Sequence, residues 1–262
     1  MLGKLMKYEL KATGRVFLPM FAALLVISIV NRLLMSLRLN TPGVIGTVIS
    51  VVLIVGILVL TVVLAIQRFR NNLLSSEGYL MMSLPVKVDG LVFSKLFVAT
   101  IWTLASFVVV AVSVLIMSLS NLNFGFLREA ARVLLEISGL SSGQLSVLAI
   151  EVFIMMVIGL FSGFMLIYAC MALSMLVNKR RGLFSFGAFI VITTAVQTVY
   201  AVLMAVAGAM GYFGRFDLIA NGVFVFRLSQ VVVLVLCLCE VIMFVVYYLV
   251  TRYMLRRRLN LQ

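Results

Sequence analysis

The sequence contains no histidine among its 262 residues. Imidazole supplies the base of Ser-His-Asp and Cys-His nucleophilic systems, the metal ligands of HExxH sites and the usual proton relay. Those classes of site are therefore excluded for this chain. The pattern G-x-S-x-G at positions 139–143 gains no catalytic meaning, because it lacks a histidine base and a preceding strand, and we interpret it as a turn.

Cysteine is scarce, and the three cysteines all lie inside apolar runs, at Cys170, Cys237 and Cys239. They form neither a disulfide framework nor a metal-ligand spacing. A cysteine in apolar surroundings usually acts as a small hydrophobic residue. We therefore expect no disulfide and no metal site from these positions.

Proline is equally rare, with three residues in the chain. Pro19 is expected in the first turns of one apolar stretch and Pro42 just before the next, where a missing N–H is tolerated. Pro85 lies between apolar stretches and is expected to end a helix there.

Acidic residues are few, eight against 21 lysines and arginines, which gives a formal net charge of +13. The basic residues lie in short clusters between apolar runs, which argues against nucleic acid as a partner. A phosphate-binding loop is also missing. Gly182 and Gly187 have the glycine spacing of G-x-x-x-x-G-K-[ST], but Ala188 and Phe189 stand where lysine and serine or threonine are required. We expect this chain to bind no cofactor itself.

Apolar residues are abundant and make up 65% of the chain, against about 45–50% in soluble domains. A helix that spans a bilayer needs about 20 predominantly apolar residues. Six stretches meet this requirement, so we predict an all-α integral membrane protein with a single transmembrane domain over 1–262. The expected spans are 16–37, 44–66, 91–119, 147–177, 183–210 and 228–250.

The distribution of basic residues predicts the orientation, because lysine and arginine resist translocation. If the N-terminus is inside, inner segments hold fifteen of them and outer segments six. We therefore expect a multi-pass protein of the plasma membrane with both termini cytoplasmic. The fifteen inner basic residues are Lys4, Lys7, Lys11, Arg15, Arg68, Arg70, Lys87, Lys95, Lys179, Arg180, Arg181, Arg252, Arg256, Arg257 and Arg258.

The first apolar stretch is expected to be retained, since it lacks an A-x-A cleavage site and is long enough to span.

The first fifteen residues have the pattern of an amphipathic helix. Leu2, Leu5, Met6 and Leu10 share one face, and Lys4, Lys7 and Lys11 share another. Such a helix can lie in the inner interface with its lysines toward anionic headgroups. Alternatively, the charges serve topology alone, and the sequence leaves both interpretations open.

The segment 67–95 is more than a topological loop. A short helix there would place Leu73, Glu77, Leu80, Met81 and Leu84 on one face before Pro85. An apolar face outside the membrane core requires either the membrane interface or a partner protein. A helix that merely lies on the bilayer is the alternative.

Three short motifs in this segment carry a family resemblance. Glu77-Gly78-Tyr79-Leu80, then Leu84-Pro85-Val86, then Ser94-Lys95-Leu96 resemble the first cytoplasmic loop of ABC-2-type transporter permeases. The opening MLGKLMKYELKATGR also resembles permease subunits of this kind from Firmicutes-type bacteria. The span count, the inner termini and the chain length agree with this family.

The resemblance implies a membrane subunit of an exporter that is energised by ATP on a separate soluble ABC ATPase subunit. Residues 72–84 would form a coupling helix seated on that ATPase, with Glu77 as a charged contact and Tyr79 as an apolar anchor. A second permease copy or a paralogue would complete the transporter. The implied coupling residues are Leu73, Glu77, Gly78, Tyr79, Leu80, Leu84 and Pro85.

Polar and small residues inside the expected spans suggest two further roles. Glu240 lies mid-span, where a charge costs roughly 2.5–3.5 kcal/mol, so it should line a pathway or bond a neighbour such as Gln197 or Thr194. Glu151 lies near an outer end, within reach of Arg128 or Arg132. A second pattern, Gly159-x-x-x-Gly163, permits close helix packing, either between two subunits or within one.

Two other functional classes stay open beside transport. One is a polytopic scaffold, sensor or immunity protein that works without an ATPase. The other is an integral membrane enzyme, against which the lack of a clustered acid, base or metal set argues.

Overall fold

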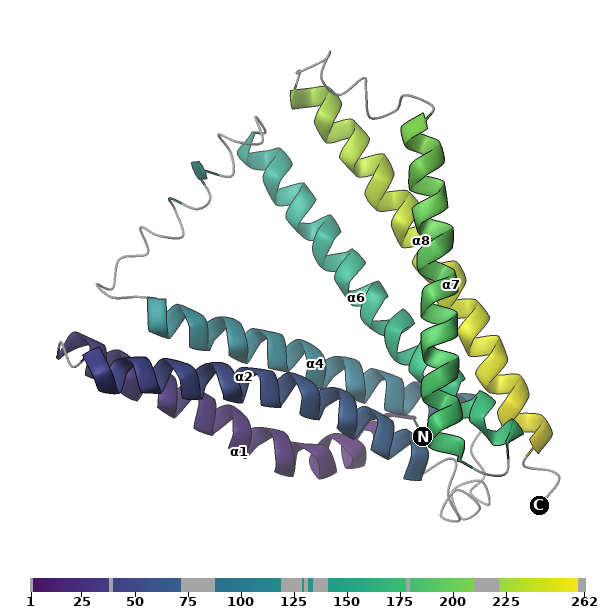
Figure 1. Ribbon diagram of the computed structural model, residues 1–262, viewed down its shortest axis with the longest axis horizontal. Coiled ribbons are helices and arrows are strands. Elements are labelled where there is room, and N and C mark those ends of the chain that lie inside the picture. The colour runs from purple at the N-terminus through teal and green to yellow at the C-terminus, as the bar shows by residue number, and fades with distance from the viewer. Residues whose placement is uncertain are drawn as a thin grey trace. The chain divides into compact units, whose positions relative to one another are not determined.

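The computed structural model describes residues 2–37, 40–71, 88–118, 129, 132–133, 141–177, 180–209 and 222–258. Helix is the regular secondary structure throughout this part of the chain, which confirms the predicted all-α class (Figure 1). The elements are α1 (Leu2–Ser36), α2 (Asn40–Phe69), α4 (Val88–Ser118), α6 (Ser142–Leu173), the 3₁₀ turn η2 (Ser174–Leu176), α7 (Arg181–Ala209) and α8 (Gly222–Arg258).

Six of these helices are long and apolar enough to cross a membrane. A helix satisfies its backbone N–H and C=O groups internally, which a segment in lipid must do. Within the described ranges the six helices expected from the apolar runs are therefore present, which supports a multi-pass membrane protein.

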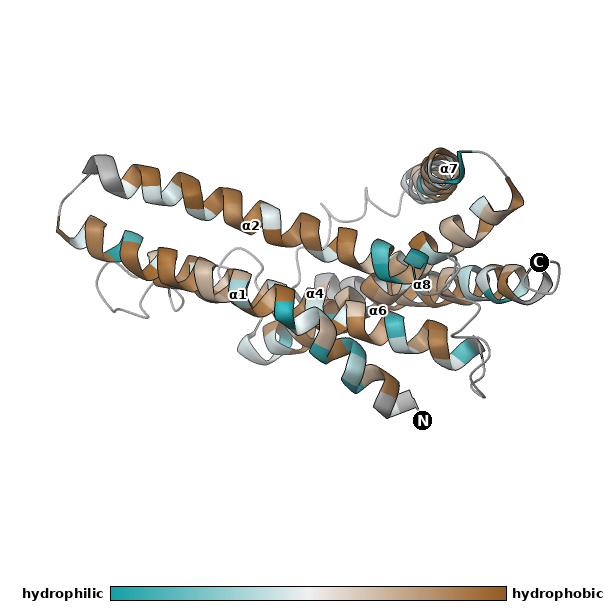
Figure 2. Cartoon of the chain, turned by 90° about the horizontal axis from the view of Figure 1, so that it is seen from below, coloured by the Kyte–Doolittle hydropathy of each residue, from teal (hydrophilic) through white to brown (hydrophobic). Residues whose placement is uncertain are grey.

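The first helix differs from the sequence prediction. Residues 2–15 do not form a separate element. They continue into the first span, because neither Arg15 nor Val16 breaks the helix. Pro19 consequently lies in the interior of α1 rather than in its first turn. A proline there removes one i→i−4 hydrogen bond and bends a helix. The N-terminal part of α1 is inclined to the remainder of the helix (Figure 2).

The helices group into two compact units, Met1–Leu127 and Arg128–Gln262. Unit 1 holds α1, α2 and α4, and each of these helices packs against the other two. In unit 2, α6 packs against both α7 and α8. The expectation of a single transmembrane domain stays a prediction.

Aromatic and aliphatic side chains form the core of unit 1. Phe17, Phe21, Leu24 and Ile57 are buried together, and Trp102 packs against them. The rings of Phe17 and Trp102 are stacked, with centroids 4.7 Å apart and an interplanar angle of 11°. These contacts hold α1 against α4. The stacked pair of rings adds to the stabilisation that burial of the side chains gives.

Buried hydroxyl groups join the same three helices farther along their length. Ser28 of α1 and Ser113 of α4 share a hydrogen bond of 2.5 Å. Thr61 of α2 and Ser106 of α4 share one of 3.2 Å. Interhelical bonds of this kind stabilise helix pairs in lipid, where the hydroxyls have no water to bind.

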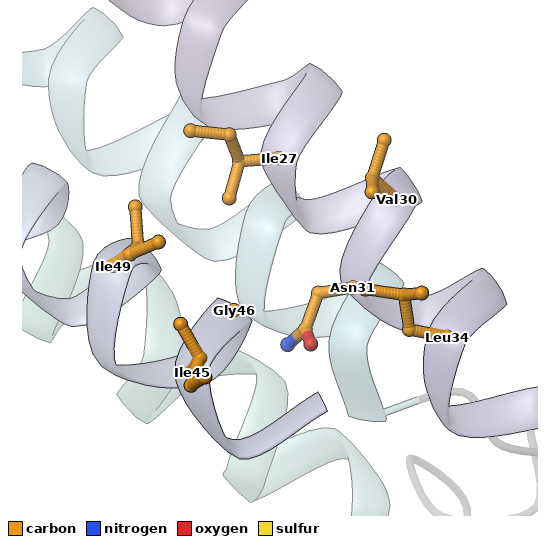
Figure 3. A pocket seen from close by; sticks show the side chains of 7 residues that line it. All are labelled: Ile27, Val30, Asn31, Leu34, Ile45, Gly46 and Ile49. Carbon is orange, nitrogen blue, oxygen red and sulfur yellow. The ribbon is translucent and has the colours of Figure 1, made fainter. Parts of the chain in front are cut away.

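An amide joins α1 to α2. In the orientation that satisfies both of its ends, Asn31 donates to the Gly43 carbonyl at 2.7 Å and accepts from the Thr47 hydroxyl at 3.0 Å. A Cβ added at Gly46 would lie 2.5 Å from the Asn31 amide, so the glycine permits this close approach. Figure 3 shows Asn31 and Gly46 at a hollow of about 490 Å³ with apolar walls formed by Ile27, Val30, Leu34, Ile45 and Ile49.

In unit 2, α6 begins at a capping residue, Ser141, rather than after a simple turn. The Ser141 side chain accepts from the Gln144 backbone N–H at 3.3 Å, and the Gln144 side chain accepts from the Ser141 N–H at 2.9 Å. This capping box explains the G-x-S-x-G pattern as a helix start. Farther along, Phe161 of α6 meets Phe244 of α8 edge to face, and Cys170 is buried as expected of a small hydrophobic residue.

We expect Gly46→Ala to lower the free energy of unfolding by about 1–3 kcal/mol, because the new methyl group overlaps the Asn31 amide. Gly56→Ala, in the same helix, is the matched control. A Cβ there meets nothing within 4 Å, so the change should be neutral or slightly stabilising. Unfolding of the purified protein in detergent measures both, and equal effects would contradict the Asn31–Gly46 contact.

Candidate functional site

Three charged side chains meet at one end of unit 1, where α1 begins, α2 ends and α4 begins. Arg68 lies in the last turn of α2, and Lys95 lies two turns into α4. Both approach Glu9 of α1. We refer to Glu9, Arg68 and Lys95 as the Glu9 cluster. Residues 72–87 connect α2 to α4 in the sequence, and the two helices that flank this segment carry Arg68 and Lys95 of the Glu9 cluster.

Each oxygen of the Glu9 carboxylate receives a different cation. Nη1 of Arg68 donates to Oε2 at 3.2 Å, and Nζ of Lys95 donates to Oε1. The side chains of Lys95 and Glu9 are 3% and 9% exposed, whereas Arg68 is 30% exposed. The cluster therefore buries one lysine and one glutamate as an ion pair, with an arginine at its edge.

Burial makes each member of this pair depend on the other. Removing an ion from water costs several kcal/mol, and a close counter-ion offsets that cost. Breaking a buried pair by removing one partner therefore leaves an uncompensated charge. Glu9 is the sole acidic residue among the first 76 positions, so this helix offers Lys95 no other carboxylate.

A hydrogen-bonded path continues from the Glu9 cluster along the contact between α1 and α4. The Thr13 hydroxyl lies 2.8 Å from the Glu9 carbonyl oxygen, to which it donates. Trp102 Nε1–H donates to the same hydroxyl at 2.6 Å. A Cβ at Gly14 would lie 3.3 Å from the Trp102 ring, so the glycine leaves space for the indole. Polar contacts thus pass directly into the aromatic core.

From the sequence, Lys95 and Arg68 were counted among the basic residues that set the topology, Lys95 was placed in a motif of the family resemblance, and Glu9 was not singled out. The available signal was the position of Glu9 on the inward face of α1, among Met6, Leu10 and Thr13. A lone acidic residue on such a face requires a cation from another helix. The predicted motif Ser94-Lys95-Leu96 proves to be buried, with each residue at most 4% exposed.

The predicted coupling residues lie outside the described residues, and their helix and contacts stay predictions. They are Leu73, Glu77, Gly78, Tyr79, Leu80, Leu84 and Pro85.

In unit 2, Glu240 of α8 interacts electrostatically with Tyr200 of α7 and Tyr247 of α8. Gln197 and Thr194 are exposed, and in the described part of the chain no hydrogen bond joins either of them to Glu240. The roles predicted for Glu240 and Gln197, a pathway lining or a bond between helices, stay predictions.

Two other predicted positions have defined surroundings. Glu151 accepts a hydrogen bond from Gln230 of α8 at 3.3 Å, a partner that differs from the expected Arg128 or Arg132. A Cβ added at Gly159 or Gly163 would meet nothing within 4 Å. These two glycines therefore do not serve close packing against the described residues of this chain.

Comparison of the chain with protein-family models, with curated proteins and with solved structures returned no match. Within residues that the structure describes, no three His, Cys, Asp or Glu side chains gather in a way that could hold a metal ion.

We expect Glu9→Gln to lower the free energy of unfolding by roughly 3–5 kcal/mol, because Lys95 would stay buried without its counter-ion. The double variant Glu9→Gln/Lys95→Met should recover much of this loss, since it removes the stranded charge. Lys11→Gln is the control, because Lys11 is exposed on the same helix. Denaturant unfolding in detergent measures all three, and a Glu9→Gln effect no larger than the control would contradict the burial of the pair.

Proposed function

We propose that this chain is the membrane-spanning subunit of an ATP-driven ABC-2-type transporter, energised by a separate soluble ATPase. In this proposal both termini and residues 72–87 lie on the cytoplasmic side of the plasma membrane. The cargo moves outward through a pathway completed by a second permease copy or a paralogue.

The observation that carries the proposal is that the helix ends on either side of 72–87, in α2 and α4, each supply a cation to Glu9 of α1. The segment begins four residues after Arg68 and ends eight residues before Lys95, and both cations bind the same carboxylate. A force applied to the segment would reach α1, α2 and α4 together, as an energy-coupling segment requires.

Two sequence features support this assignment. The motifs around Glu77, Leu84 and Lys95 resemble the first cytoplasmic loop of ABC-2 permeases, and the chain lacks a phosphate-binding loop. A subunit without a nucleotide site requires an external source of energy. The excess of lysine and arginine in the segments that include 1–15 and 67–90 favours the inner side for both.

A mechanism follows from these elements. Residues 72–84 form the coupling helix, in which Glu77 makes a charged contact with the ATPase and Tyr79 an apolar one. When ATP closes two ATPase subunits upon each other, the coupling helices move together. Each Glu9 cluster passes this movement to its three helices, which tilt and change the access to the pathway.

The test is purification of the tagged chain from membranes of its source cells. We expect a soluble subunit with the motif G-x-x-x-x-G-K-[ST] to co-purify and to hydrolyse ATP in the complex. Glu77→Lys and deletion of 72–84 should each reduce its recovery at least tenfold. Glu129→Lys is the matched control, because Glu129 is exposed and lies in a predicted outer segment.

Recovery of the ATPase with the 72–84 deletion would overturn the coupling assignment. If no such ATPase accompanies the intact chain under conditions that preserve other ABC complexes, the scaffold, sensor or immunity alternative would take its place.

A further inference from the structure

The first four turns of α1 expose a row of basic side chains. Lys7, Lys11 and Arg15 are all exposed and follow one another at intervals of four residues, so they lie on one face of the helix. We call these three residues the basic stripe. The opposite face carries Glu9 and Thr13, which are buried against the other helices of unit 1.

The same exposed face becomes apolar directly after Arg15. Leu18 is 62% exposed, and farther along the face Ile29 and Leu33 are 49% and 57% exposed. From Leu18 to Leu33 the helix rises about 23 Å, most of the roughly 30 Å of a bilayer core. Figure 2 shows hydrophilic positions recurring near the N-terminus of α1 before a predominantly hydrophobic stretch. We therefore expect the edge of the membrane core where charge gives way to hydrocarbon, between Arg15 and Leu18.

This boundary sets the depth of the basic stripe. With Arg15 at the edge of the core, Lys11 and Lys7 lie at most about 6 Å and 12 Å beyond it, because the N-terminal part of α1 is inclined to the remainder of the helix (Figure 2). Headgroups extend roughly 5–8 Å beyond the core on each side, within the reach of these long side chains. Tyr8 lies beside the stripe and is 72% exposed, as is typical of aromatic residues at a membrane interface.

The charge of the stripe is not neutralised by its own helix. Glu9, the acidic residue of α1, faces the other way and is bound by Arg68 and Lys95. In the described ranges no ion pair joins a carboxylate to Lys7, Lys11 or Arg15. Three positive charges at headgroup depth therefore match a surface that carries phosphate groups.

We propose that the basic stripe binds the headgroups of anionic phospholipids in the leaflet beside the N-terminal end of α1. The inference does not depend on the proposed transport function. It also favours one of the two interpretations that the sequence left open, because the exposure and depth of the stripe, and the lack of a described ion pair, suit lipid binding better than topology alone. The Glu9 cluster contributes by holding the opposite face of α1 against α2 and α4, which directs the stripe outward.

The test titrates the purified, detergent-solubilised chain with phosphatidylglycerol and, separately, with phosphatidylcholine, and counts bound lipids by native mass spectrometry. We expect the intact chain to prefer phosphatidylglycerol. In Lys7→Gln/Lys11→Gln/Arg15→Gln the preference should fall at least fivefold for the three charges together, since each contributes electrostatic attraction to anionic lipid. Lys7→Arg/Lys11→Arg/Arg15→Lys keeps the charge and should keep the preference.

Two single substitutions provide a matched comparison of position. Lys11→Gln should weaken phosphatidylglycerol binding more than Arg181→Gln, which removes one exposed charge from α7. Circular dichroism and thermal unfolding in detergent confirm that each variant is folded. Soluble glycerol 3-phosphate should not displace the lipid.

Three results would each overturn the proposal. The first is equal binding of the two lipids by the intact chain, and the second is an unchanged preference in the folded triple-glutamine variant. The third is displacement by glycerol 3-phosphate, which would identify a site for a free phosphate rather than a lipid surface.

Discussion

The ion pair between Glu9 and Lys95, with Arg68 at its edge, is the interaction on which the first unit depends. It connects α1, α2 and α4 through one carboxylate whose partners lie 59 and 86 residues away. Apolar packing alone fixes such helices weakly in lipid, because lipid tails are as apolar as the side chains they replace. The buried ion pair favours this arrangement, because separating Glu9 from Lys95 would leave a buried charge without its partner.

This one contact gives α1 two faces with different roles. Its inward face holds Glu9, Thr13 and Phe17, which join α4 through Lys95 and Trp102. Its outward face carries the basic stripe. The helices on either side of the proposed coupling segment both contact Glu9, so this segment and the proposed lipid contact both depend on the geometry set by Glu9. A force on the segment and the attraction from the leaflet would therefore act on the same group of helix ends.

The helices were predictable from sequence because apolar runs of about 20 residues have few alternatives in a bilayer. Their boundaries were less predictable. Positions 2–15 carry more charge than the span that follows, yet no residue ends the helix before it, and Pro19 proved to be interior. Ser141 begins a helix through a Ser-x-x-Gln capping box that the catalytic pattern obscured.

The candidate site could be predicted from the sequence only in part. The basic residues were correctly noted as clusters, but the pairing of Glu9 with Lys95 depends on tertiary contacts that no periodicity encodes. Gly46 and Asn31 illustrate the same limit, because a glycine that admits an amide is recognisable once both helices are in place. The basic face of α1 was easier to predict, because the spacing of residues along one helix shows which of them share a face.

The central claim is that residues 72–84 face the cytoplasm together with the termini, and single-cysteine labelling tests it most directly. In a background without Cys170, Cys237 and Cys239, Ser76→Cys and Ser142→Cys would each be treated with a membrane-impermeant maleimide. The account predicts that intact cells label the cysteine at position 142 and leave position 76 unlabelled until the membrane is opened. Labelling of position 76 in intact cells would contradict it.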